Sequence, residues 1–124
     1  MNIVDSSGWL EYFAGSPNAE FFAAAVENVD ALLVPSISLY EVFKSVLRQR
    51  GEDAAVQSVA VMLRGRVLPL DQATALHAAK LSVELQMPMA DSIILATARA
   101  HKALLWTQDA HFAAQPDVRY IPKA

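Results

Sequence analysis

The sequence has no cysteine, no surplus of positive charge and no long hydrophobic run. Without cysteine, the 124-residue chain cannot form disulfides, thiolate zinc sites or thiol nucleophiles, which suits a reducing cytoplasm. Ten Lys and Arg residues against thirteen Asp and Glu residues give a net charge of −3, which argues against nucleic-acid binding through broad phosphate neutralisation. No uncharged stretch approaches the roughly 20 residues of a membrane span, and residues 1–5 do not resemble a signal peptide. We therefore expect a soluble, cytoplasmic protein with no membrane partner.

Hydrophobic residues make up 54% of the chain, enough for the core of one domain over residues 1–124. Short apolar runs alternate with segments whose apolar residues recur at helical spacing. The runs predict strands at Asn2–Val4, Leu32–Val34, Val67–Leu68, Leu104–Thr107 and Val118–Ile121. Since these runs lack in/out alternation and helices separate them, they indicate a parallel sheet covered on both faces. The predicted fold class is α/β, a three-layer α/β/α sandwich with a four-to-five-stranded parallel sheet.

The apolar spacing also predicts six helices. They are expected around Trp9–Phe13, Phe21–Val26, Leu39–Leu47, Glu52–Leu63, Asp71–Leu85 and Ala90–His101. Ser36 or Ser38 is expected to cap the third helix, because serine hydroxyls accept hydrogen bonds from free backbone N–H groups. Gly51 is expected to end that helix.

Four carboxylates stand where a parallel-sheet protein would place a ligand site. Asp5 ends the first predicted strand, and Asp109 follows the Leu104–Thr107 strand after a single residue, at the carboxyl ends where ligands bind. Asp91 lies in the first turn of its helix and Glu41 near the start of another, both among apolar neighbours. Each acid alone has a commoner role, as a helix cap or a solvated helix residue.

Together, the four acids suggest a metal site. Two carboxylates about 4 Å apart repel each other by about 4 kcal/mol at an effective dielectric near 20, so their convergence calls for a cation. Hard oxygen ligands suit Mg²⁺ or Mn²⁺, whereas the absence of cysteine and the scatter of the three histidines argue against zinc. His111 is expected to be an ordinary surface histidine.

Four motifs carry a resemblance to a known family. They are Val4-Asp5-Ser6-Ser7, Tyr40-Glu41-Val42-Phe43-Lys44, Ala90-Asp91-Ser92-Ile93-Ile94-Leu95-Ala96-Thr97-Ala98 and Thr107-Gln108-Asp109-Ala110-His111-Phe112. In this order they resemble a PIN domain, and the whole chain is similar in length and layout to the VapC toxins of toxin–antitoxin modules. The resemblance implies Mg²⁺ or Mn²⁺ in an acidic crevice and cleavage of RNA. It also implies that Asp5, Glu41, Asp91 and Asp109 are the catalytic, metal-binding acids, with Thr107 at a small hydroxyl position.

The chemistry of phosphodiester hydrolysis gives these acids distinct expected roles. A bound divalent cation activates water near neutral pH and stabilises the departing oxygen. Asp5 and Asp91 are the first choices as direct ligands, Asp109 binds directly or through water, and Glu41 orients or deprotonates the attacking water. Ser6 is a possible supporting residue.

Two cations accompany Glu41 on its helix. Lys44 and Arg48 follow it by three and seven positions, hence on the same helical face. They either guide phosphate toward the crevice or form a solvated, salt-bridging face. Gln108 and Ala110 depart from the family, in which Asn or basic residues are common at these positions.

The resemblance further implies a VapB-like antitoxin bound at a groove flanked by the early helices, and a homodimer. Two other functions compete with a ribonuclease. A receiver-type signalling domain has a similar size and an acidic Mg²⁺ pocket, but it needs adjacent acids after the first strand, where Ser6 stands here. A degenerate PIN-like module that only binds a partner is expected to lose acids, and all four are present.

Overall fold

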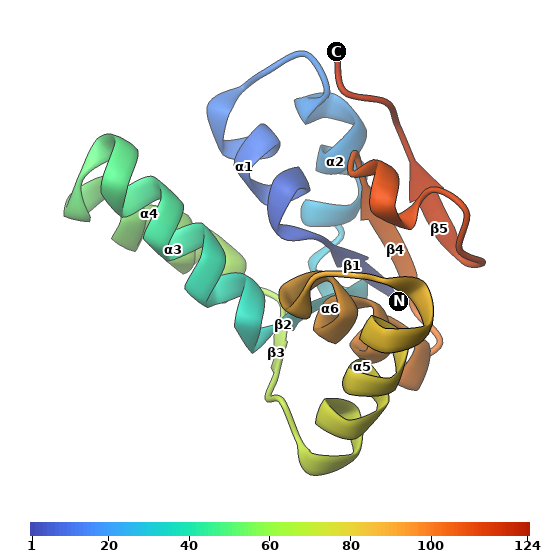
Figure 1. Cartoon of the computed structure of the whole chain (residues 1–124). Coiled ribbons are helices and arrows are strands. Elements are labelled where there is room, and N and C mark those ends of the chain that lie inside the picture. Colours follow the sequence, from blue (N-terminus) through green and yellow to red (C-terminus); the bar gives the residue numbers. More distant parts are fainter.

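A computed structural model describes residues 1–124, and a five-stranded parallel sheet forms its centre. The strand order is β3-β2-β1-β4-β5 (Figure 1). The strands are β1 (Asn2–Val4), β2 (Leu32–Pro35), β3 (Arg66–Leu68), β4 (Leu104–Thr107) and β5 (Val118–Tyr120). Ile3 in β1 pairs with Leu33 on one side and Leu105 on the other, so β1 is the central strand. The predicted parallel sheet is confirmed, with each strand within one residue of its expected bounds.

Six helices surround the sheet in two layers. They are α1 (Ser6–Ala14), α2 (Ala19–Val26), α3 (Ser36–Arg50), α4 (Glu52–Met62), α5 (Gln72–Leu85) and α6 (Met89–Ala100). Consecutive residues of β1 face opposite layers. Ile3 packs with Leu81 of α5 and Ile94 of α6, whereas Val4 packs with Trp9 of α1 and Val42 of α3. Because strands alternate their side chains between faces, both sides of the sheet are buried, and the α/β/α sandwich is confirmed.

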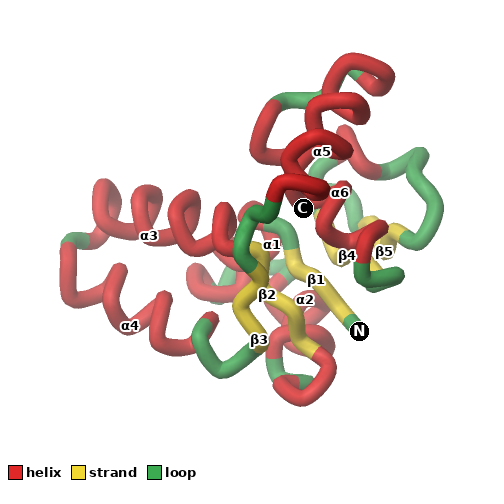
Figure 2. Tube along the Cα trace, turned by 90° about the horizontal axis from the view of Figure 1, so that it is seen from below, coloured by secondary structure: helices red, strands yellow, loops and turns green.

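Helices α3 and α4 form an antiparallel hairpin that extends away from the sheet (Figures 1 and 2). Gly51 joins them with a φ of +90°, which a residue bearing a Cβ adopts only with strain. The glycine therefore permits the reversal that ends α3 and starts α4.

The start of α3 differs from the sequence prediction. Pro35 occupies the N-cap position and no side chain caps the helix, so the expected Ser36 or Ser38 cap is wrong. The physical reason is that β2 runs into α3 without a connecting loop, and the φ of −61° at Pro35 already suits a helix start. Ser38 instead lies inside the protein, fully buried, with no partner for its hydroxyl.

The strand order rejects the receiver-type alternative. Receiver domains have the strand order 2-1-3-4-5, whereas this sheet has the order 3-2-1-4-5. Strands β2 and β3 are added on one side of β1, and β4 and β5 on the other, so the strand order reverses between β1 and β4. In such sheets, the crevice at the reversal point beyond the strand ends is the place for a ligand. None of the helices combines the length and apolarity needed to cross a membrane.

Candidate active site

The reversal point of the sheet carries Asp5 and Asp109. Asp5 directly follows β1, and Asp109 lies two residues after the end of β4, the neighbouring parallel strand. Two acids far apart in the chain therefore leave the sheet at the same edge. The first turn of α6 brings Asp91 to them, and the second turn of α3 brings Glu41 into contact with Ser6, the residue after Asp5.

Asp5 is buried and its carboxylate is fully engaged by hydrogen bonds. The residue is 2% exposed. Its Oδ1 accepts from the backbone N–H of Gly8 at 2.8 Å, its Oδ2 accepts from Thr107 Oγ1 at 2.7 Å, and Ser7 Oγ lies 2.9 Å from both oxygens. Asp5 thus also caps α1. Burial raises the pKa of Asp5 from 3.8 to about 6, and the hydrogen bonds partly offset this rise.

Thr107 connects Asp5 to Asp109. Its side chain is fully buried at the end of β4, where Oγ1 donates to Asp5 and accepts from the backbone N–H of Asp109 at 2.9 Å. This single hydroxyl fixes the positions of both acids relative to the sheet. The interaction gives a physical basis to the hydroxyl that was expected at this position.

Asp91, Asp109 and His111 form the tightest group of potential ligands. One ligand atom from each of the three residues lies within 4.8 Å of the other two. His111 Nδ1 is 3.1 Å from Asp91 Oδ2 and 3.5 Å from Asp109 Oδ1. Asp109 also accepts from the backbone N–H of His111 at 2.9 Å, which holds the imidazole beside the carboxylates. The sequence prediction that His111 is an ordinary surface residue missed this contact, although its side chain is 58% exposed.

The two carboxylates of this group disfavour each other's negative charge. Burial raises the pKa of Asp91, and the nearby Asp109 carboxylate raises it further, while His111 opposes the rise. The hydrogen bond to Asp91 raises the pKa of His111, and the Asp109 charge adds to that effect. Because two carboxylates and an imidazole are donors that Mn²⁺ and related divalent ions accept, the residues present fit a divalent metal.

Glu41 and Lys44 lie at the edge of this arrangement. Glu41 Oε1 accepts from Ser6 Oγ at 2.6 Å, so Ser6 supports Glu41 and sets it next to the residue that follows β1. Neither Glu41 nor Asp5 belongs to the three-residue ligand group. Lys44 Nζ contacts the Tyr40 hydroxyl at 3.3 Å and forms no ion pair with any of the four acids.

A buried polar network behind the site was also missed by sequence reasoning. Gln108 is 7% exposed; its Oε1 accepts from Asn18 Nδ2 at 3.0 Å, and its Nε2 donates to Glu11 Oε1 at 3.3 Å. Asn18 Nδ2 also donates to the carbonyl of Pro122 at 3.0 Å. Gln108 therefore ties α1 to the end of β4, and Asn18 extends the network to the C-terminal segment, which explains the burial of Gln108 beside a site of charged residues.

Comparisons with known proteins agree with this site and fold. The PIN domain family model matches residues 3–117. The chain therefore belongs to the PIN domain family. Ribonuclease VapC4 of Mycobacterium tuberculosis is 38% identical over 96 residues, which cover 71% of this chain and 74% of that protein. Within the family, the chain is accordingly of the VapC type.

Solved structures show the same fold. A toxin–antitoxin complex from Klebsiella pneumoniae matches with a TM-score of 0.81 at 22% identity, covering 96% of both chains. The VapC20 toxin of Mycobacterium tuberculosis, described as cleaving the sarcin–ricin loop, matches with a TM-score of 0.79 at 20% identity and covers 94% of this chain and 95% of that one. At these identities, the structures support the architecture alone.

Proposed function

We propose that this chain is a metal-dependent endoribonuclease that hydrolyses RNA phosphodiester bonds and is neutralised by an antitoxin. One observation carries the proposal: four acids from four separate segments join into one chain of contacts at the reversal point of the sheet. Glu41 reaches Ser6 next to Asp5, Asp5 reaches Asp109 through Thr107, and Asp109 reaches Asp91 through His111. An acid that only caps a helix would need none of these contacts with the other acids.

Asp91 and Asp109 would hold the metal, Mg²⁺ or Mn²⁺, with His111 as a third donor. The bound cation supplies an activated water and neutralises charge on the phosphate. Asp5 would add negative charge to the site and, through Thr107, orient Asp109, and its expected role as a direct ligand stays a prediction. The Asp5 carboxylate accepts hydrogen bonds from three donors, Gly8, Ser7 and Thr107, and its remaining lone pair would serve for direct ligation.

Glu41 would orient or deprotonate the attacking water. Ser6 occupies Oε1 of Glu41, which leaves Oε2 as the acceptor for a water proton. Glu41 lies outside the ligand group, and its contact with Ser6 connects it to the segment that follows β1. This geometry suits a residue that acts on a water next to a metal better than one that binds the metal itself.

The partners follow from the same family membership. RNA is the proposed substrate, and a VapB-like antitoxin is the proposed inhibitor, since the similar structure from Klebsiella pneumoniae is a toxin–antitoxin complex. A cytoplasmic site of action suits both partners and the cysteine-free sequence. A homodimer remains a prediction, which light scattering of the isolated chain would test.

The proposal is tested by incubating the purified chain, freed of any partner, with structured RNA and Mn²⁺. Wild type is expected to cut the RNA. Asp91→Asn and Glu41→Gln are each expected to lower the rate at least a hundredfold, because removing a catalytic acid typically costs two or more orders of magnitude. Asp117→Asn is the matched control, since Asp117 is exposed and its φ of +58° suits asparagine equally well.

The alternative of a non-catalytic PIN-like module makes the opposite prediction. Intact RNA after incubation of wild type with several RNA classes, together with tight binding of a protein partner, would establish the binding module. Equal cleavage by wild type and Asp91→Asn would point to a contaminating nuclease and contradict the assignment of the site.

A further inference from the structure

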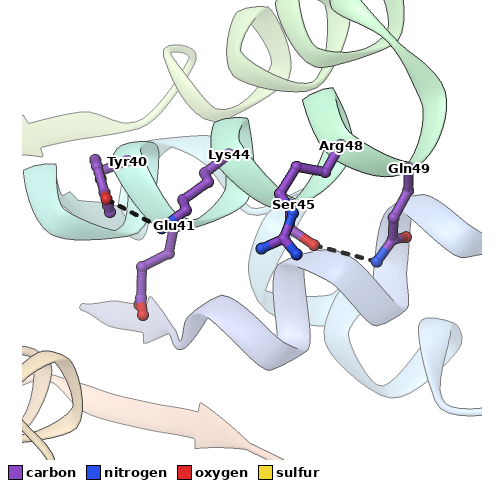
Figure 3. Close-up of a pocket in the computed structure, with 6 residues that line it drawn as sticks. All are labelled: Tyr40, Glu41, Lys44, Ser45, Arg48 and Gln49. Carbon is purple, nitrogen blue, oxygen red and sulfur yellow. Dashed lines mark hydrogen bonds between the residues drawn. The ribbon is translucent and has the colours of Figure 1, made fainter.

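A shallow, open groove runs along one face of α3. Its volume is about 520 Å³, and its lining residues all come from α3: Tyr40, Glu41, Lys44, Ser45, Arg48 and Gln49. Figure 3 shows the side chains of Glu41, Lys44 and Arg48 projecting from this face of the helix. The lining is almost entirely polar, because Tyr40 is its single hydrophobic member.

The two cations of the groove are unpaired. The ion pairs of the structure are Lys80 with Glu84, and His111 with Asp91 and Asp109, so no carboxylate lies within 4.0 Å of Lys44 or Arg48. The salt-bridging face considered from the sequence is therefore absent. Tyr40 instead holds Lys44, through its hydroxyl at 3.3 Å and a ring centroid 5.5 Å from the ammonium nitrogen. In a chain of net charge −3, this groove carries two cations without an ion pair and a single acid, Glu41, at one end.

The groove is continuous with the acidic site. Glu41 lines its first part and, through Ser6, contacts the segment that follows β1. Lys44 and Arg48 lie four residues apart on the helix, which separates their Cα atoms by about 6 Å along the axis. A charged strand lying in the groove would therefore meet two cations in sequence before it reaches the acids.

We propose that this groove binds the phosphate backbone of single-stranded RNA next to the cleavage position, with Lys44 and Arg48 each neutralising one phosphate. This inference rests on the proposed function, because it gives the groove the substrate of the neighbouring site. Two cations in the groove would allow a protein of net negative charge to bind a polyanionic substrate locally. An acidic protein segment fits less well, since protein interfaces depend on buried aromatic or aliphatic anchors, and this groove offers one tyrosine.

The test measures binding of a labelled single-stranded RNA oligonucleotide at several salt concentrations, with a chelator present to prevent metal-dependent cleavage. The double variant Lys44→Gln/Arg48→Gln is expected to bind at least tenfold more weakly at low salt. The slope of log affinity against log salt should fall in magnitude by about 1.4, since each phosphate contact on a single strand contributes about 0.7. The control Lys80→Gln/Arg66→Gln removes the same charges from exposed positions on α5 and β3 and should leave the slope unchanged.

Each result decides the inference. An unchanged slope in the Lys44/Arg48 variant, an equal loss in the control, or no RNA binding by wild type overturns it. Loss of antitoxin binding with RNA binding intact makes the groove a protein interface and also overturns it. The outcome is separate from the proposed function: wild type that cleaves RNA while the slope stays unchanged keeps the nuclease and rejects the groove. If the salt slope falls in the Lys44/Arg48 variant but wild type does not cleave RNA in Mn²⁺, the groove is kept and the nuclease is rejected.

Discussion

At the scale of single residues, Asp5 is the acid whose surroundings most oppose its charge. It is almost completely buried, and burial raises its pKa to about 6 against 3.8 for the free side chain. The folded protein therefore holds this proton more tightly than the unfolded chain. The resulting contribution to stability is present below about pH 4 and is lost as the pH rises through about 6.

Replacing Asp5 with asparagine removes this pH dependence. In the metal-free state, the stability of Asp5→Asn relative to wild type should increase by about 2 kcal/mol between pH 4 and pH 8, most of the free-energy equivalent of a pKa rise from 3.8 to about 6. Urea unfolding at several pH values, with chelator present, measures the difference. Asp117→Asn, at an exposed position, should track wild type across the range, and a pH-independent difference for Asp5→Asn would contradict the prediction.

His111 gives the site a nitrogen donor that the four acids alone lack. The distances of 3.1 and 3.5 Å to Asp91 and Asp109 resemble the separations between neighbouring ligands around an ion bound at about 2.1 Å. Imidazole favours transition metals over Mg²⁺. His111→Gln should therefore weaken Mn²⁺ binding about tenfold and Mg²⁺ binding much less, as measured by titration calorimetry.

His101→Gln is the control for this change, because His101 is exposed and lies outside the ligand group. Equal losses for both metals in His111→Gln would show that the histidine positions the carboxylates and is not itself a ligand.

The four acids stood out in the sequence because Asp5 and Asp109 follow strands, and Asp91 and Glu41 lie in apolar stretches of helix. His111 did not, because its contact with Asp91 joins residues on two separate elements, the 3-10 helix Ala110–Phe112 and α6. The nearest available signal was its position two residues after Asp109. Gln108 was missed for a similar reason: its partners Asn18 and Glu11 come from the α1 region of the chain, which only the folded structure brings to β4.

At the scale of elements, the first turn of α1 depends on the absence of a side chain at Gly8. A Cβ at this position would lie 2.6 Å from Phe22 and 2.7 Å from Val4. Alanine normally stabilises a helix relative to glycine by about 1 kcal/mol. Here the crowding reverses the sign, because extra atoms in a packed core cost about 1–3 kcal/mol.

Gly8→Ala should therefore lower the unfolding free energy by about 1–2 kcal/mol, measured by urea denaturation. It should also lower the cleavage rate, since the Gly8 N–H binds Asp5. A double-mutant cycle with Phe22→Leu provides the check on the cause. If Gly8→Ala costs as much in the Phe22→Leu background as in wild type, steric contact between α1 and α2 is not the reason.

The elements themselves followed closely from the sequence. Unbroken apolar runs indicated the buried strands, and helical spacing indicated the six helices, because burial on both faces leaves a clear signal in each. The start of α3 was the exception. Serine at a helix start usually signals a cap, but the direct passage from β2 through Pro35 leaves no room for one. A local preference was overridden by the connection between two elements, which sequence spacing alone does not reveal.

At the scale of the whole molecule, the acids concentrate negative charge at one edge of a protein whose net charge is already −3. Asp109 raises the pKa of both Asp5 and Asp91, so the cluster destabilises the folded state when all its members are ionised. A divalent cation would relieve this repulsion. Metal binding and folding stability are thus coupled through the same residues.

The coupling leads to a prediction for the complete chain. Mn²⁺ at a hundred times its Kd should stabilise the folded protein by about 2.7 kcal/mol, which for a domain of this size corresponds to a rise in Tm of about 10 °C. At one fixed Mn²⁺ concentration, the rise should be larger at pH 8 than at pH 5, because the carboxylates must be ionised and His111 neutral to bind the ion. Differential scanning calorimetry with and without chelator measures both effects. Asp117→Asn should respond like wild type, whereas Asp91→Asn should show little response; an equal rise in Asp91→Asn would place the metal elsewhere on the molecule.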